Sequence, residues 1–126
     1  MNILLDTHVL LWVLVEPERI SENVLQEIKN PANRIYVSSV SILEMVIKQS
    51  LGKLNVPDNI ESVLNLQRFL QLPITFKHAL HVGNLPSIHG DPFDRLLIAQ
   101  AQEDGLILVT ADRIIPQYPN IQIMKV

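Results

Sequence analysis

The sequence predicts an α/β protein in which helices flank a central, mainly parallel β-sheet. Short apolar runs alternate along the chain with segments of helical spacing, a pattern typical of layered folds with parallel strands. The length of 126 residues suits one domain, residues 1–126, with a core of its own. No internal repeat, low-complexity tract or linker interrupts the pattern. We therefore expect a ligand site beyond the carboxyl ends of the strands.

The first part of the chain predicts two strands separated by two helices. The first apolar run ends in Asp6, and either Asp6 or Thr7 can cap the buried helix that follows. Pro17 ends or kinks that helix. Ser21 starts an amphipathic helix, and a β-rich segment comes after it. The predicted elements are strand 2–5, helix 8–15, helix 21–29 and strand 34–37.

The middle of the chain predicts two helices, a short strand and a third helix. Ser38, Ser39 or Ser41 can start the first helix, and Gly52 ends it. Pro73 has no N–H to donate, which places the short strand at an edge of the sheet. The predicted elements are a helix to about residue 50, loop 53–58, helix 59–70, strand 72–75, helix 76–82 and loop 83–90.

The last part of the chain opens with a clearly marked helix start. Asp91 can act as the N-cap, and Pro92 then occupies the first helical position, where its fixed φ suits a helix. The residues between Asp94 and Ala101 are nearly all apolar, so this helix is predicted to be buried. It is followed by strand 106–109, a proline-containing loop and strand 121–126.

Composition narrows the kinds of protein that the chain can be. It contains no cysteine, which excludes disulfides and thiolate metal sites, and no apolar run has the length of a membrane span. The first residues lack the basic region of a signal peptide, so we expect a cytoplasmic protein with no membrane partner. A net charge of −3 argues against binding a polyanion by charge alone. Because only 18% of the residues are charged, we expect an oligomer or a partner to cover part of the surface.

Four carboxylates are predicted to meet at one rim of the sheet. Asp6 follows the first strand, Asp112 follows strand 106–109, and Asp94 lies at the start of the helix that leads into that strand. Right-handed crossovers place these three residues on the same side. Glu44 lies early in the helix after the second strand, among apolar neighbours, where a carboxylate needs a partner.

Such a cluster repels itself unless a cation lies between its members. Oxygen ligands in a chain without cysteine suit Mg²⁺ or Mn²⁺. Ions held by a few carboxylates act on phosphoryl groups, where they polarise the phosphate and activate a water. The residues therefore predict metal-dependent hydrolysis of a phosphodiester, with the hydroxyl of Thr110 as a possible support.

Each acid also has a purely structural interpretation. Asp91 and Asp94 can do no more than cap their helix. Asp6 and Asp112 can be ordinary strand-end residues, and Glu44 can pair with a lysine one turn away, at position 48. All of them falling on one rim by chance is much less probable than any single structural role.

The basic residues give weaker signals. His8 and His89 lie near the predicted rim, but neither has the spacing of a metal ligand, so loop or core roles are expected for both. Lys48, Lys53 and Arg95 can meet phosphates, although most surface cations are merely solvated. No glycine-rich phosphate loop and no nucleophile elbow is present.

The order of these residues resembles the PIN-domain family, and most closely the VapC-type toxins of bacterial toxin–antitoxin pairs. The resemblance covers essentially the whole chain, and its most specific part is the helix start around Asp94. One departure is Leu43, where this subgroup often has an aromatic residue before the glutamate. The matching stretches are Asp6-Thr7-His8, Leu10-Leu11-Trp12, Ser41-x-x-Glu44, Gly52-Lys53-Leu54, Asp91-Pro92-Phe93-Asp94-Arg95 with the apolar residues up to Ala101, and Thr110-Ala111-Asp112.

The resemblance implies a three-layer PIN-like fold and a Mg²⁺- or Mn²⁺-dependent endoribonuclease that cleaves RNA. It also implies a cognate antitoxin protein that blocks the cleft, and a toxin homodimer. The implied catalytic metal ligands are Asp6, Glu44, Asp94 and Asp112, with Thr7 and Thr110 as supporting residues and Asp91 as the helix cap.

Two other functions compete with this one. A receiver-type signalling domain also binds Mg²⁺ with acids at strand ends, but the second predicted strand ends in Ser38-Ser39 rather than in an aspartate. A non-catalytic binding module could share the fold, but the intact set of acids argues against it.

Overall fold

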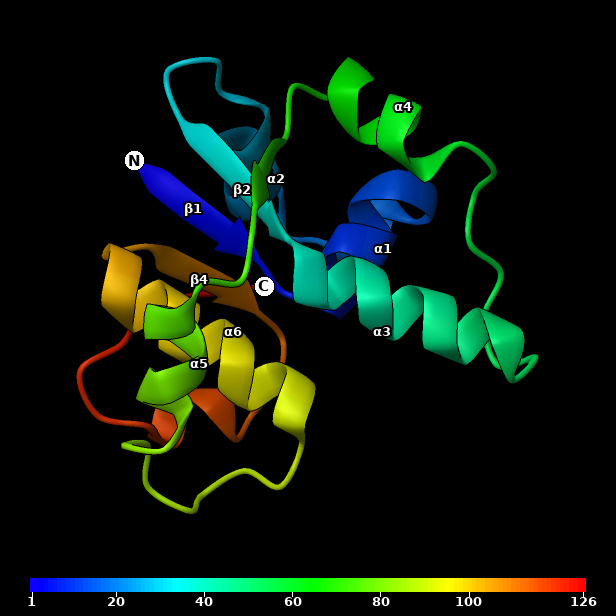
Figure 1. Ribbon diagram of the computed structural model, residues 1–126. Helices are drawn as coiled ribbons and strands as arrows, with labels where there is room; N and C mark the ends of the chain where they lie inside the picture. Colours follow the sequence, from blue (N-terminus) through cyan, green and yellow to red (C-terminus); the bar gives the residue numbers. More distant parts are fainter.

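The computed structural model describes residues 1–126 and contains one sheet of five parallel strands (Figure 1). The strands are β1 (Asn2–Leu5), β2 (Arg34–Ser38), β3 (Leu70–Leu72), β4 (Ile107–Thr110) and β5 (Gln122–Lys125). They lie in the order β3-β2-β1-β4-β5. The predicted parallel sheet is thus confirmed, with β1 at its centre and the strand before Pro73 at an edge.

Helices cover both faces of the sheet, which gives the three layers (Figure 1). In β1, Ile3 and Leu5 pack on one face with α1, α2 and α4, while Leu4 packs on the other face with α6. The helices are α1 (Thr7–Val15), α2 (Glu22–Lys29), α3 (Ser39–Ser50), α4 (Ile60–Leu66), α5 (Phe76–Val82) and α6 (Pro92–Asp104). Short 3₁₀ turns span Pro17–Arg19 and Ile115–Gln117. None of the helices is both long and apolar enough to cross a membrane.

Polar side chains cap the first turns of four helices, including α5, where Thr75 accepts from the His78 amide. The Asp6 carboxylate accepts from the Val9 amide at the start of α1, which decides between the two predicted caps in favour of Asp6. The Ser38 hydroxyl accepts from the Val40 amide at the start of α3. Asp91 caps α6, as predicted. These caps satisfy amides that no helical carbonyl can reach.

The predicted helix and edge strand are both present, but the predicted bounds of 59–70 and 72–75 are wrong. The helix ends at Leu66 and the strand is Leu70–Leu72. Arg68 adopts a left-handed φ of 62°, and its amide bonds to Asn65 while the Phe69 amide bonds to Leu64. This C-terminal capping pattern usually has glycine at the left-handed position, and an arginine there does not indicate it.

The carboxyl ends of all strands lie at one edge because every pairing is parallel. Asp6 directly follows β1, and Asp112 comes two residues after the end of β4. Helix α6 leads into β4 and therefore begins at the same edge. Its first turn holds Asp94 there.

Candidate metal centre

Asp6 lies at the centre of the acidic rim and is almost completely buried, with 4% of its surface exposed. One carboxylate oxygen accepts from the Val9 amide at 2.8 Å, and the Thr110 hydroxyl also hydrogen-bonds the carboxylate. Burial raises the pKa of Asp6, the two hydrogen bonds work against this rise, and the negative charge of Asp112 adds to it. A buried acid with a raised pKa, facing another acid, is suited to hold a cation.

Asp91 and Asp94 have different roles at the start of α6. Asp91 Oδ1 accepts from the Phe93 amide at 2.8 Å and from the Asp94 amide at 3.4 Å, so Asp91 alone supplies the cap. The Asp91 amide donates to His89 instead of to the side chain of Asp94, which rules out a reciprocal capping box. The carboxylate of Asp94 therefore takes no part in capping α6.

The environment of Asp94 disfavours its charge. Burial, followed by the negative charge of Asp91, raises the pKa of Asp94 from 3.8 to about 7. Asp112 and Asp6 raise the pKa further, whereas His89 lowers it. The negative charges of Asp6 and Asp112 thus both act on the pKa of Asp94, as expected for three acids on one rim.

Asp112 is held firmly in its ionised form. Partial burial raises the pKa of Asp112, but hydrogen bonds from the Ile114 amide, the His89 ring and the Ile115 amide outweigh it, and the pKa lies below its ordinary value. Oδ1 accepts from the two amides at 2.6 Å and 3.2 Å. The Asp112 amide donates to Thr110, so this threonine contacts both neighbouring acids.

His89 is the residue of this cluster that the sequence analysis does not predict. A loop or core role was expected, but the ring Nε2 lies 3.0 Å from Asp94 Oδ2 and 3.2 Å from Asp112 Oδ2. One ligand atom from each of these three residues lies within 4.8 Å of the others, an arrangement that can hold a metal ion. The only local signal was the position of His89, two residues before the cap.

Glu44 lies in α3, which packs against α6, and is 3% exposed. Lys48 Nζ lies 2.7 Å from Glu44 Oε2, so the pairing over one turn that the structural interpretation of Glu44 requires is present. The hydrogen bond to Glu44 is the main reason why the pKa of Lys48 is raised, and the charges of Asp91 and Asp94 raise it further. Lys48 therefore lies within the electrostatic field of the aspartates, on the side from which Glu44 approaches.

The other oxygen of Glu44 supports a metal interpretation. Glu44 Oε1 is buried and has no hydrogen-bond partner in the protein, although a buried polar atom normally has one.

Thr7 Oγ1 donates to Ser41 Oγ at 2.9 Å and ties the start of α1 to α3, one turn before Glu44. The candidate ligands Asp6, Glu44, Asp94 and Asp112 thus supply oxygen donors and excess negative charge, and both features fit a hard divalent cation.

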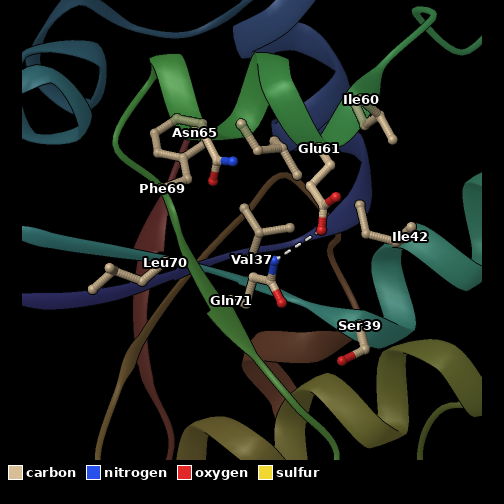
Figure 2. Close-up of a pocket in the computed structure, with 10 residues that line it drawn as sticks. Val37, Ser39, Ile42, Ile60, Glu61, Asn65, Phe69, Leu70 and Gln71 are labelled. Atoms are coloured by element: carbon tan, nitrogen blue, oxygen red, sulfur yellow. Dashed lines mark hydrogen bonds between the residues drawn. The ribbon is translucent and has the colours of Figure 1, made fainter.

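A separate cavity of about 230 Å³ does not belong to this centre. It lies between α3, α4 and β3, and the hydrogen bond from Gln71 to Glu61 spans it at 3.4 Å (Figure 2). Most of its lining is apolar, and none of the four candidate ligands reaches it. It lacks the paired acids that phosphoryl chemistry needs.

Comparison with known proteins agrees with the geometry. The family model described as PIN domain matches residues 3–121. Ribonuclease VapC22 from Mycobacterium tuberculosis (strain ATCC 25618 / H37Rv) is 34% identical over 123 residues, which span 89% of this chain and 88% of the relative.

Solved structures share the fold. The structure of VapBC2 from Rickettsia felis bound to a DNA fragment from their promoter has a TM-score of 0.74 at 20% identity, covering 100% of this chain and 99% of that chain. VapBC-1 from nontypeable Haemophilus influenzae has a TM-score of 0.68 at 23% identity, covering 99% of this chain and 98% of that chain.

Proposed function

This chain belongs to the PIN-domain family, and from that premise we propose that it is a metal-dependent endoribonuclease, the toxin of a toxin–antitoxin pair. The observation that carries the proposal is the convergence of Asp6, Asp94 and Asp112, whose mutual repulsion contributes to a pKa of about 7 at Asp94. The resemblance to a named ribonuclease supports RNA as the substrate.

Four residues would hold the metal, and each has a defined support. Asp6 is fixed by its cap to α1, Asp112 by two amides, Asp94 by the His89 ring and Glu44 by Lys48. When bound, Mg²⁺ or Mn²⁺ supplies positive charge to a phosphate and lowers the pKa of a water. Because the bound ion would supply positive charge where the phosphate lies, a protein with a net charge of −3 can act on RNA.

The other residues of the site have two kinds of role. The threonines hold the metal ligands in place, and Glu44 can bind the metal or orient the attacking water. Thr110 and Thr7 act within the protein, because their hydroxyls contact Asp6, Asp112 and Ser41. Glu44 Oε1 is the one buried carboxylate oxygen of the rim with no hydrogen-bond partner. It either ligates the metal or accepts a hydrogen bond from the attacking water and orients it.

The test is cleavage of an RNA mixture in Mg²⁺, in Mn²⁺ and in excess EDTA. We expect cleavage with either ion and none in EDTA. Asp6→Asn should abolish cleavage without unfolding the protein, because asparagine also caps helices well. Asp58→Asn, which alters an exposed acid in the loop between α3 and α4, is the matched control and should cleave like the wild type. Full cleavage in EDTA or by Asp6→Asn contradicts the proposal.

A cognate antitoxin is the proposed protein partner. The structural neighbours include VapBC assemblies, and an acidic rim attracts a basic side chain from an inhibitor. Co-expression with the protein encoded beside this gene should give a complex that does not cleave RNA. Failure of every neighbouring product to bind or inhibit the chain contradicts this part of the proposal.

A homodimer is proposed for the chain itself. Phe76 and Leu80 lie one turn apart on α5 and are 90% and 76% exposed, an unusual cost for a monomer. Light scattering at high concentration should give twice the mass of 14.3 kDa. A monomer at all concentrations excludes the dimer.

A further inference from the structure

The imidazole of His89 bridges two of the acids and is itself held in place. Its Nε2 lies 3.0 Å from Asp94 Oδ2 and 3.2 Å from Asp112 Oδ2, and only 12% of the side chain is exposed. Asp112 lies 23 residues further along the chain, so the ring joins two segments that are distant in the sequence. A ring in this position fixes the orientation of one carboxylate relative to the other.

The second ring nitrogen determines which tautomer is present. His89 Nδ1 lies 3.2 Å from the Asp91 amide, and a backbone N–H can only donate. Nδ1 therefore accepts, and the proton of the neutral ring is on Nε2. His89 consequently presents an N–H to both carboxylates rather than a lone pair to a cation.

The backbone of His89 is clamped by two further residues. Its amide donates to Tyr118 Oη at 2.7 Å, and Arg95 Nη1 donates to the same oxygen at 3.1 Å. The Arg95 guanidinium also donates to the carbonyls of Pro86 and Val82, at 2.8 Å and 3.1 Å. Arg95 and Tyr118 thus hold the segment that carries the imidazole.

We propose that His89 is a positioning residue of the metal centre, which sets through its Nε2–H the arrangement of Asp94 and Asp112 that binds the divalent cation. The inference rests on the proposed function, because it assigns these aspartates to a metal. An imidazole or other donor behind a ligand typically changes metal affinity by about 10–100-fold.

The experiment measures binding of Mg²⁺ and of Ni²⁺ by calorimetry, with no RNA present. His89→Ala should weaken both ions by a similar factor of about 10–100. His89→Gln, whose side-chain amide can donate from the same place, should stay within about threefold of the wild type. His81→Gln changes a histidine bound to Gln102 and Glu103, away from the rim, and is the matched control.

Three results overturn the inference. Unchanged affinities in His89→Ala exclude any role at the metal. A loss much larger for Ni²⁺ than for Mg²⁺ shows that the ring nitrogen is itself a ligand, because Ni²⁺ prefers imidazole and Mg²⁺ prefers oxygen. RNA cleavage by His89→Ala that stays low at saturating Mg²⁺ shows that His89 contacts the substrate.

Two further readouts keep the inference testable. Tyr118→Phe removes the hydroxyl that accepts from His89 and should weaken Mg²⁺ binding in the same direction but less, even if His89→Ala fails to fold. If Mg²⁺ binding depends on His89 but the wild type cleaves no RNA, the proposed function is contradicted and this inference still holds. Normal cleavage with binding independent of His89 contradicts this inference alone.

Discussion

Glu44 and Lys48 form an ion pair of 2.7 Å across one turn of α3, and this pair occupies only one of the two carboxylate oxygens of Glu44. The glutamate side chain is 4% exposed and the lysine side chain 39% exposed. Lys48 therefore places a positive charge beside a buried carboxylate from the solvent side, while the second oxygen has no hydrogen-bond partner in the protein.

Removing that lysine should weaken metal binding. In Lys48→Met the buried Glu44 carboxylate loses the group that holds it in place, so Mg²⁺ affinity and RNA cleavage should both fall. Because Lys48 is partly exposed, the unfolding free energy should fall by only about 0.5–1 kcal/mol. Lys53→Met, at an exposed position, is the control, and equal Mg²⁺ affinities in the two variants contradict the role of Lys48.

The stability of the metal-free protein should depend on Asp94 in a defined pH range. The pKa of Asp94 is raised from 3.8 in the unfolded chain to about 7 in the fold, so the folded state binds more protons between these values. Stability should therefore fall as the pH rises from about 4 to about 7, and level off above that. Asp6, whose pKa is also raised, acts in the same direction.

Melting temperatures in EDTA at pH 5 and pH 8 test this expectation. The wild type should lose more stability over that interval than Asp94→Asn, which has no proton to release at this position. Equal losses in the two proteins are evidence against a raised pKa at Asp94. Asp112 does not interfere, because its pKa is lowered and it stays ionised throughout this range.

Asp91 should affect stability through its cap and Asp94 through its charge. Asp91→Ala removes the acceptor for the Phe93 amide and should cost about 1 kcal/mol. Asp91→Ser retains a cap but not the charge, so stability should change little while the pKa of Asp94 falls. Urea unfolding and a carboxylate titration by NMR measure the two effects. A serine variant as unstable as the alanine variant excludes the cap as the cause.

Arg95 should matter for folding rather than for binding phosphates. Its guanidinium donates hydrogen bonds to Tyr118 Oη and to backbone carbonyls, including those of Pro86 and Val82. Lysine cannot make these bonds at once, so Arg95→Lys should lower the unfolding free energy by about 1–3 kcal/mol. The salt dependence of RNA binding should not change. A lower salt slope indicates a phosphate contact instead.

Local chemistry explains which parts of the site were predictable. Asp6 and Asp91 cap helices that their own neighbours form, and Glu44 pairs with a lysine four residues away. The contacts of His89 depend on how its loop folds against Tyr118 and Asp112, and no periodicity reports such a contact. The early end of α4 was missed for a related reason, since Arg68 occupies a left-handed position that its residue type does not indicate.

That Asp94 holds a metal and does not cap α6 is tested by the RNA cleavage rate of Asp94→Asn in Mg²⁺, read beside its melting temperature in EDTA. Asparagine is nearly isosteric but lacks the charge that holds Mg²⁺, and Asp91 still supplies the cap. We expect cleavage to fall by orders of magnitude, with a melting temperature equal to or above that of the wild type, because one repelling carboxylate is neutralised. A variant that melts clearly lower and cleaves RNA like the wild type contradicts the claim.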